Sequence, residues 1–398
     1  MPNSSSIILY DDGDWSEGHY KSIFCLYLKA CLQSGMNVCA ACPLPNEVHN
    51  WISAHCPRYS ANCTVYKTCG KTLKSPHYRL KPFIRLAWWA RASRTVRRIR
   101  HIDAEAGGVL FLNINHLRGK VWADRFADRL MPCPWAAMIF DSSCVRQPGS
   151  INLPQYFNFL NAKQCKAFGV TDEKMIDPMQ KAFPQISILF LPDATPEEVD
   201  ATAPLARDII SRSKGRKIVG LLGMLHKRKG LLTALKLAQS RPDLFFLFAG
   251  AYNLNKFSPS EKNFVQSFFD RPPENCFCYL QRIADEAEFN ALVQLTDIIF
   301  AVYPGFTNSS GLLTKAGLFE KPCLVAEGNT CMADRVEKYN LGIRVPPDDI
   351  TACSESIDRL LRPDVQSKKP LFKEFRTDFN EQALQTALQQ LSKRIIAK

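Results

Sequence analysis

Two loops in the second half of the sequence combine residue types that suit the binding of a phosphate group. The first loop, GMLHKRKG at residues 223–230, follows the apolar segment 217–222 and carries Arg228 and Lys229. Cations at the carboxyl end of a strand can neutralise a diphosphate group as negative charge develops on it. A solvated basic turn is the alternative interpretation.

The second loop follows the apolar segment 297–302 and leads through Ser309, Ser310 and Gly311 into an expected helix. The first amide groups of a helix lack partners within the helix and carry about half a positive charge, which favours phosphate. Gly311 permits close approach, and the two hydroxyls can add hydrogen bonds. A serine that only caps the helix also explains this segment, but the two loops together favour a diphosphate site.

The elements that must position these loops alternate between strand and helix. In the second half, strands are expected at 217–222, 244–249, 275–279, 297–302 and 322–326, and helices at 231–239, 286–295, 311–319 and 334–339. In the first half, strands are expected at 6–10, 37–41, 109–114, 135–140 and 187–191, with a helix at 20–34. This alternation predicts an α/β fold of two Rossmann-like domains with a cleft between them. Ligands are expected at the carboxyl ends of the strands, in that cleft.

The bulk composition narrows the class of protein and of partner. The 398 residues are 46% hydrophobic and carry a net charge of +13, which indicates a globular protein with an anionic partner. The start of the chain shows no secretory signal, so the 15 cysteines are expected to be reduced and the protein cytoplasmic. Cys39 and Cys42 form one CxxC pair, which is interpreted as the end of a buried strand, and no metal is expected.

The order of these motifs resembles a known family. The Lys-Gly end of the 223–230 loop is followed by Ala249-Gly250, the small-residue helix start, KPCLV at 321–325 and Leu341-Gly342. This order resembles the retaining glycosyltransferases of the GT-B fold, family 4 type, over about residues 217–361. The resemblance implies transfer of a sugar, of the hexosyltransferase type, from a nucleotide-sugar donor without a metal. The donor is a substrate, so no cofactor is expected.

The resemblance also implies roles for single residues. Lys229 and Arg228 would bind the donor diphosphate, and the segment around Arg282 and Ile283 would contact the base. The family's two glutamates, eight positions apart, fall on Thr307 and Lys315. Thr307, Asn308 and Lys315 are therefore the candidates for the donor sugar and ribose, although a lysine has no acceptor for ribose hydroxyls. Two alternatives follow, a non-catalytic nucleotide- or glycan-binding GT-B protein and a nucleotide-sugar epimerase.

The resemblance further divides the chain into parts. Residues 1–195 would form an N-terminal, acceptor-side domain, and residues 213–370 a C-terminal domain that binds the nucleotide sugar. Residues 371–398 are predicted to form a helix that returns to the N-terminal domain. The acceptor would be a lipid-linked sugar, a polysaccharide or another hydrophobic glycan.

Three side chains of the first domain are candidates for catalysis. His19 follows Gly18 at an expected helix start, where the glycine would let the backbone approach the other domain closely. His116 follows the strand at 109–114, and Asp141 ends the strand at 135–140. Each could bond the donor phosphate or the acceptor hydroxyl, and each could instead be a capping or surface residue. In a retaining mechanism the departing phosphate can itself take the acceptor proton, so a separate base is optional.

A basic and aromatic stretch at residues 74–101 contains nine Lys or Arg and no acidic residue. Trp88 and Trp89 suit a membrane interface, and Arg91, Arg94 and Arg98 would attract anionic lipid from another face of the helix. A helix with its apolar face in the core is the equally weighted alternative. Nucleic acid is the less favoured partner. The protein would then lie peripherally on the inner face of a membrane.

Overall fold

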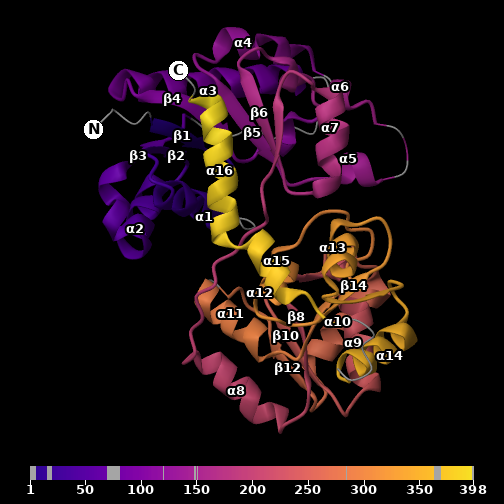
Figure 1. Cartoon of the computed structure of the whole chain (residues 1–398). Helices are drawn as coiled ribbons and strands as arrows, with labels where there is room; N and C mark the ends of the chain where they lie inside the picture. The colour runs from indigo at the N-terminus through magenta and orange to yellow at the C-terminus, as the bar shows by residue number, and fades with distance from the viewer. Residues whose placement is uncertain are drawn as a thin grey trace. The chain divides into compact units, whose positions relative to one another are not determined.

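The computed structural model describes residues 6–396 apart from 16–19, 70–80, 120, 148, 150, 284 and 363–368. The chain divides into two compact units, Met1–Pro192 with Glu381–Lys398, and Asp193–Asn380. Each unit contains a parallel sheet accompanied by helices (Figure 1). The structure therefore confirms the predicted α/β fold.

The sheet of the first unit has seven strands in the order β3-β2-β1-β4-β5-β6-β7, and each neighbouring pair is parallel. The strands are β1 (Ser6–Tyr10), β2 (Val38–Cys42), β3 (Cys63–Lys67), β4 (Ala106–Phe111), β5 (Trp135–Ile139), β6 (Cys165–Val170) and β7 (Ser187–Phe190). The strand order reverses between β1 and β4. All five residues of β1, β2 and β5 are buried, which explains why these strands form continuous apolar runs in the sequence.

The sheet of the second unit has six strands in the order β12-β10-β8-β13-β14-β15, again all parallel. They are β8 (Ile218–Leu222), β10 (Phe245–Ala249), β12 (Cys276–Tyr279), β13 (Ile298–Ala301), β14 (Cys323–Ala326) and β15 (Gly342–Val345). A separate parallel pair joins β9 (Leu225–His226) to β11 (Tyr252–Asn253). The sequence patterns predicted none of β3, β6, β9, β11 and β15.

Helices accompany both sheets (Figure 1). In the first unit they are α1 (Tyr20–Gln33), α2 (Pro45–His55), α3 (Lys81–Ile102), α4 (Ala127–Leu130), α5 (Ser143–Arg146), α6 (Leu153–Tyr156), α7 (Ile176–Ala182) and α16 (Glu381–Ile395). In the second unit they are α8 (Pro204–Ser213), α9 (Leu231–Ser240), α10 (Pro259–Asp270), α11 (Glu286–Leu295), α12 (Gly311–Leu318), α13 (Cys331–Tyr339), α14 (Ile350–Leu360) and α15 (Phe372–Phe379). None of the helices in the described part of the chain is long and apolar enough to cross a membrane.

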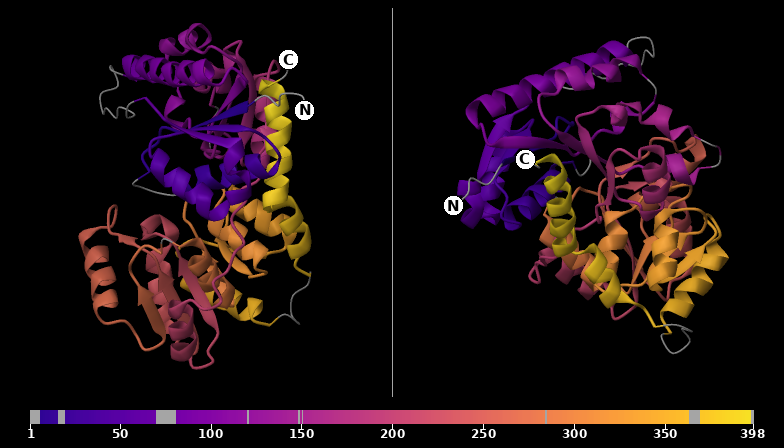
Figure 2. Two further views of the ribbon diagram at one scale, coloured as in Figure 1. Left: turned by 90° about the vertical axis from the view of Figure 1, so that its left-hand side faces the viewer. Right: turned by 45° about the horizontal axis from the view of Figure 1, so that its top comes forward.

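The C-terminal segment forms two helices instead of the single predicted one, with Asn380 between them. Helix α15 belongs to the second unit, where the Phe375 ring packs so closely that a Cβ atom on Gly317 would lie 2.3 Å from it. Helix α16 lies along the first unit (Figure 2), where the Glu381 carboxylate is 2.9 Å from the Lys29 ammonium group.

Helix α3 belongs to the core of the first unit. Trp88 and Trp89 are 1% and 0% exposed. Their indole nitrogens donate to carboxylates inside the unit, Trp88 to Asp12 at 3.1 Å and Trp89 to Asp124 at 3.2 Å. The two indoles therefore do not form the membrane-facing surface that the sequence allowed, because the apolar face of this helix covers the sheet.

Candidate functional site

The strand order of the second sheet places its switch point between β8 and β13. From β8 the chain continues to β10 and β12 on one side, and β13, β14 and β15 follow on the other. Ligands of open α/β sheets bind outside the carboxyl ends of the strands at such a point. The loops that leave β8 and β13 at this end are residues 223–230 and 302–310, the two loops that the sequence singled out.

Glycines bring these loops close together. Gly230 has a φ of 70°, and a Cβ atom there would lie 2.3 Å from the Val302 carbonyl oxygen at the end of β13. Gly250, which follows β10, has a φ of 143°, and its Cβ atom would lie 2.0 Å from the Gly223 oxygen. Only glycine fits at either position, so both residues are needed for the loops to pack at the sheet edge.

The first loop holds two cations against aromatic rings of the second loop. The Lys229 ammonium group lies 4.9 Å from the Tyr303 ring centroid, and the Arg228 guanidinium lies 4.4 Å from that of Phe306. Neither cation takes part in an ion pair with another described residue. Lys227 differs, because its ammonium group is 2.7 Å from the Glu261 carboxylate. The loop therefore presents two cations without a protein counter-charge.

His226 stands beside these cations and remains neutral near pH 7. Burial, together with the positive charges of Arg228, Lys229 and Lys256, lowers its pKa to about 4. A neutral imidazole can donate one hydrogen bond and accept another. The sequence analysis did not select His226, although it lies within the selected loop.

The start of α12 is open. Ser310 occupies the N-cap position, but its side chain makes no capping hydrogen bond. Its carbonyl oxygen accepts the first helical bond from the Thr314 amide at 3.1 Å. Gly311 is exposed, and a Cβ atom placed on it would have no atom within 4 Å. The serine does not use its hydroxyl as a cap here, and the space beside Gly311 is open.

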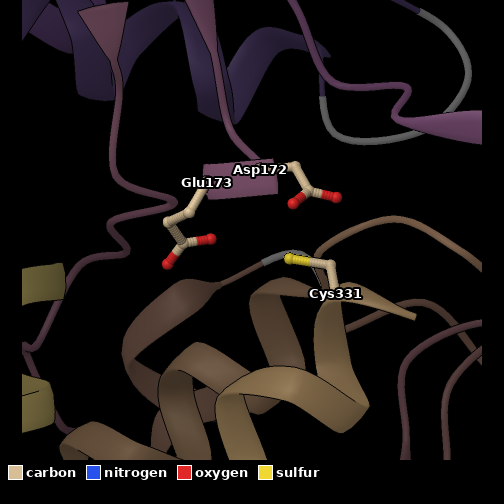
Figure 3. A group of neighbouring side chains, drawn as sticks. All are labelled: Asp172, Glu173 and Cys331. Atoms are coloured by element: carbon tan, nitrogen blue, oxygen red, sulfur yellow. The ribbon is translucent and has the colours of Figure 1, made fainter. Parts of the chain in front are cut away.

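The loop before α12 is tied to the next helix. The Cys331 amide, at the start of α13, donates to the Thr307 carbonyl oxygen at 2.9 Å. The Thr307 hydroxyl in turn donates to the Asn308 side chain at 3.2 Å. Figure 3 shows the Cys331 side chain at this helix start. Thr307 and Asn308 thus lie beside the open helix start, as their assignment to donor binding requires.

Lys315 does not lie with them. Its side chain is 8% exposed, and its ammonium group is 2.9 Å from the Glu286 carboxylate. It also donates to the Asn290 side-chain oxygen at 2.5 Å, and burial lowers its pKa. Both partners of the ammonium group are side chains of α11. The group therefore does not point to a phosphate or ribose at the start of α12.

Arg282 and Ile283 follow β12, the edge strand of the second sheet. Arg282 is exposed and Ile283 is half-buried. Both leave the sheet at its carboxyl edge, two strands from β8. This position is compatible with contact to a nucleotide base by their backbone groups.

The candidates of the first unit have different surroundings. Gly18 and His19 lie outside the described residues. His116 is exposed as a residue, but its ring packs against Trp88 with centroids 4.9 Å apart. Burial of that ring, with the charges of Arg85 and Arg91, lowers the pKa of His116 to about 4. The imidazole is thus uncharged at neutral pH.

Asp141 has partners that favour a structural role. Its carboxylate pairs with the Arg118 guanidinium and accepts a 2.9 Å hydrogen bond from the Ser143 amide at the start of α5. These two contacts hold the carboxylate within its own loop. Asp141 therefore acts here as a loop and helix-start residue.

Asp11 is a residue that the sequence analysis did not select. It follows β1 and accepts hydrogen bonds from the Gly13 amide at 2.7 Å and the Trp15 indole at 3.2 Å. Burial raises the pKa of Asp11 to about 6. The signal was available, because the acidic segment DDGD directly follows the strand at the switch point of the first sheet.

The CxxC cysteines lie at a buried strand, as expected. Cys39 and Cys42 belong to β2 and both are buried. Burial raises the pKa of the Cys42 thiol to about 12, and the Cys39 thiol lies 3.2 Å from the Asp103 carboxylate. The interpretation of this pair as part of a buried strand is confirmed, and the expectation that it binds no metal stays a prediction.

Comparison with known proteins identifies the architecture. No family model and no curated protein matches this sequence. Sucrose-phosphate synthase from Thermosynechococcus elongatus is similar in structure, with a TM-score of 0.67 and 14% identity over 98% of each chain. A glycosyltransferase from Rickettsia africae ESF-5 has a TM-score of 0.67 and 12% identity over 100% of each chain. HepE from Anabaena, in complex with UDP and glucose, has a TM-score of 0.65 and 10% identity over 98% of this chain and 99% of that chain. The chain therefore has the GT-B fold.

Proposed function

We propose that this protein is a glycosyltransferase that takes a sugar from a nucleotide-sugar donor. The observation that carries the proposal is the switch point of the second sheet, where Lys229 and Arg228 lie over Tyr303 and Phe306 of the loop that leads into α12. Two cations without a protein counter-charge beside free helical amides form a seat for a diphosphate. The complex of the similar protein HepE with UDP and glucose supports the choice of ligand.

The proposed reaction needs little from the protein beyond this seat. The bond between the sugar C1 atom and the diphosphate oxygen breaks, and the diphosphate leaves with the electron pair. The acceptor hydroxyl forms the new bond to C1 on the same face, and its proton passes to the departing phosphate. Lys229 and Arg228 neutralise the charge that develops on the leaving group, a task that a metal performs in other sites. We therefore propose retention of configuration without a metal.

The remaining donor contacts follow from the same edge of the sheet. Thr307 and Asn308 lie directly before the helix start and are proposed to bind the sugar and ribose. The backbone at Arg282 and Ile283 is proposed to contact the base. Lys315 is left out of this set, because its ammonium group is held by Glu286.

A membrane contact is proposed at a different surface from the one around Trp88. Phe83 and Trp122 are 62% and 45% exposed, and their ring centroids lie 6.2 Å apart. Exposed Arg125 donates to the Trp122 carbonyl oxygen at 3.1 Å, and Lys81 precedes Phe83 by half a turn. Exposed aromatic rings with basic neighbours suit the surface of an anionic bilayer. This contact would place a cytoplasmic protein beside a lipid-linked or other hydrophobic glycan acceptor.

The test of donor use combines binding with turnover. The protein is incubated with UDP-, GDP- and ADP-sugars, with and without EDTA, while the melting temperature and the release of nucleotide are measured. We expect a saturable rise in melting temperature with one nucleotide class and release of that nucleotide when an acceptor glycan is added, both unaffected by EDTA. No thermal response to any nucleotide would contradict the diphosphate seat. A response without turnover on a broad acceptor panel would favour a non-catalytic binding protein.

The membrane contact is tested separately by co-sedimentation with anionic vesicles. The double variant Phe83→Ser, Trp122→Ser should lose most of the pelleted fraction, whereas Arg94→Ser, on the exposed side of α3, should retain it. Equal pelleting of the double variant and the wild type would refute this surface.

A further inference from the structure

Arg91, on α3, is a buried arginine with two guanidinium nitrogens that have no partner among the described residues. The residue is 8% exposed, and its Nε and Nη2 atoms are both buried without a hydrogen-bond partner. No ion pair within the described ranges includes it. A buried guanidinium is always charged and is costly to bury unless an anion compensates it.

Other buried arginines of the same unit show what is missing. Arg85, almost two turns earlier on α3, pairs with Asp124 at 2.7 Å and donates to the Arg118 carbonyl oxygen at 2.8 Å. Arg146 uses its Nε and Nη2 atoms together, and these donate to the two carboxylate oxygens of Asp172. That edge of the guanidinium matches two oxygens of a carboxylate or phosphate side by side. In Arg91 no described residue accepts a hydrogen bond from the Nε and Nη2 atoms of this edge.

The surroundings of Arg91 place it at the switch point of the first sheet. Its charge acts on the side chains of Tyr10, at the end of β1, and His116, in the loop after β4. Both rings pack on Trp88, with centroids 6.3 Å and 4.9 Å from it. β1 and β4 are the neighbours between which the strand order reverses. Within the described part of the chain the buried Tyr10 hydroxyl likewise meets no partner at hydrogen-bond geometry, so it can serve as a second donor.

The charge balance around this position leaves room for an anion. Asp12 is the nearby carboxylate that follows β1, and one of its oxygens accepts from Trp88 at 3.1 Å. Arg85 and Arg91 both act on His116, whose neutral ring can donate a hydrogen bond without adding charge. The guanidinium of Arg85 is already paired with Asp124, and no ion pair among the described residues joins Asp12 to Arg91.

We propose that Arg91, with Tyr10 and His116, binds an oxyanion of the ligand, a phosphate or carboxylate group, through the Nε–Nη2 edge of its guanidinium. The site belongs to the first unit alone and is separate from the diphosphate seat of the second. It rests on the proposed function only in assigning the oxyanion to the acceptor, which would then be an acidic or phosphorylated glycan.

The test titrates inorganic phosphate, methyl phosphate and acetate into the full-length protein without nucleotide, at constant ionic strength. Melting temperature and the phosphorus NMR linewidth are the readouts. We expect a saturable rise of a few degrees in the wild type and in Arg94→Met, an exposed residue of the same helix. The response should be lost in Arg91→Met and weakened at least tenfold in Arg91→Lys, which keeps the charge but lacks the two-pronged edge. The anion that saturates the response at the lower concentration, phosphate or acetate, identifies the class of oxyanion.

A second measurement keeps the proposal testable if the ligand binds weakly. Without any oxyanion, Arg91→Met should melt at or above the wild-type temperature, because an apolar chain of similar length replaces an uncompensated buried charge. An oxyanion response in Arg91→Met equal to that of the wild type, or no response in the wild type, would overturn the site. Titration of UDP into the same proteins separates the two proposals. If the wild type responds to phosphate but does not bind UDP, only the donor site is refuted, because the phosphate titration contains no nucleotide.

Discussion

The diphosphate seat makes its sharpest prediction at two lysines of one loop. Lys229 lies over the Tyr303 ring without a carboxylate partner, whereas Lys227, two residues earlier, is paired with Glu261 at 2.7 Å. Replacement of each by methionine keeps the length and the apolar stem of the side chain. Lys229→Met should weaken UDP binding, and Lys227→Met should leave it nearly unchanged.

The expected loss of UDP affinity follows from two contacts of Lys229, the one it gains with the diphosphate and the one it gives up with the Tyr303 ring. A hydrogen bond to a charged group contributes about 1.5–3 kcal/mol. The contact with the Tyr303 ring already contributes roughly 0.5–1 kcal/mol in the free protein, and part of it is lost when the ammonium group turns to phosphate. The difference is about 1–2.5 kcal/mol, which corresponds to a roughly 5- to 60-fold increase in Kd.

Isothermal titration calorimetry of UDP, with the wild type and both variants, measures this difference. Repeating the titration in 50 mM and 300 mM salt should narrow the gap between wild type and Lys229→Met, because salt screens a partly exposed charge. The reasoning fails if Lys229→Met binds UDP within twofold of the wild type. It fails equally if Lys227→Met weakens binding as much as Lys229→Met.

Three other substitutions probe the scaffold of the two units. Gly230→Ala should lower the free energy of unfolding in urea by at least about 2 kcal/mol, because the residue has a φ of 70° and its Cβ atom would lie 2.3 Å from the Val302 oxygen; an unchanged midpoint would refute the close approach. Lys315→Met should cost about 1–2 kcal/mol in the same assay while UDP affinity stays constant, since its partners are within the protein. Asp11 has a pKa raised to about 6 by burial, so the folded state holds its proton more tightly than the unfolded state does. The stability that this proton contributes is fully present below about pH 4, near the unfolded pKa, and is lost as the pH rises through 6, by up to about 3 kcal/mol. Asp11→Asn should lack this decline, so the wild-type minus variant difference in unfolding free energy should fall as the pH rises from 4 to 6, and parallel curves would contradict it.

The elements around the site could be predicted because they are buried on both faces. β8 and β13 are apolar throughout, and loops with glycine, lysine and serine follow them, so both the strands and the selected loops were visible in the sequence. β3 and β15 were missed for the opposite reason. They are edge strands whose residues are mostly half-buried or exposed, and their short, mixed sequences carry no clear period.

The partners of single side chains could not be predicted. Helical spacing showed that Trp88 shares a face with other apolar residues, but the spacing cannot tell whether that face meets a sheet or a lipid surface. The structure decides through Asp12, which lies 76 positions away in sequence and binds the indole. Lys315 depends in the same way on Asn290, 25 positions earlier, and local sequence contains no information about that contact.

The environment of Lys315 explains how a donor site can work without the glutamates of the family that the sequence resembles. Asn290 accepts from Lys315 and donates to the carbonyl oxygens of Pro196 and Glu198 at 2.9 and 2.8 Å. A lysine at this position therefore holds α12 against α11 and the 196–198 segment. The helix start is fixed from behind, and under the proposed function its amide groups would bind the donor without help from a carboxylate.

A last prediction follows from this rigid helix start. If the backbone amides and not the hydroxyls bind the diphosphate, Ser309→Ala and Ser310→Ala should each raise the Kd for UDP by less than about fivefold, which corresponds to less than about 1 kcal/mol. Gly311→Val should cost more than either, since its branched side chain would stand in space that is open at the helix start. Gly311→Ala is the matched control, as a lone Cβ atom there meets nothing within 4 Å and should change the free energy of unfolding little. If calorimetry gave a larger increase in Kd for the serine variants than for Gly311→Val, hydroxyl groups and not amides would hold the phosphate.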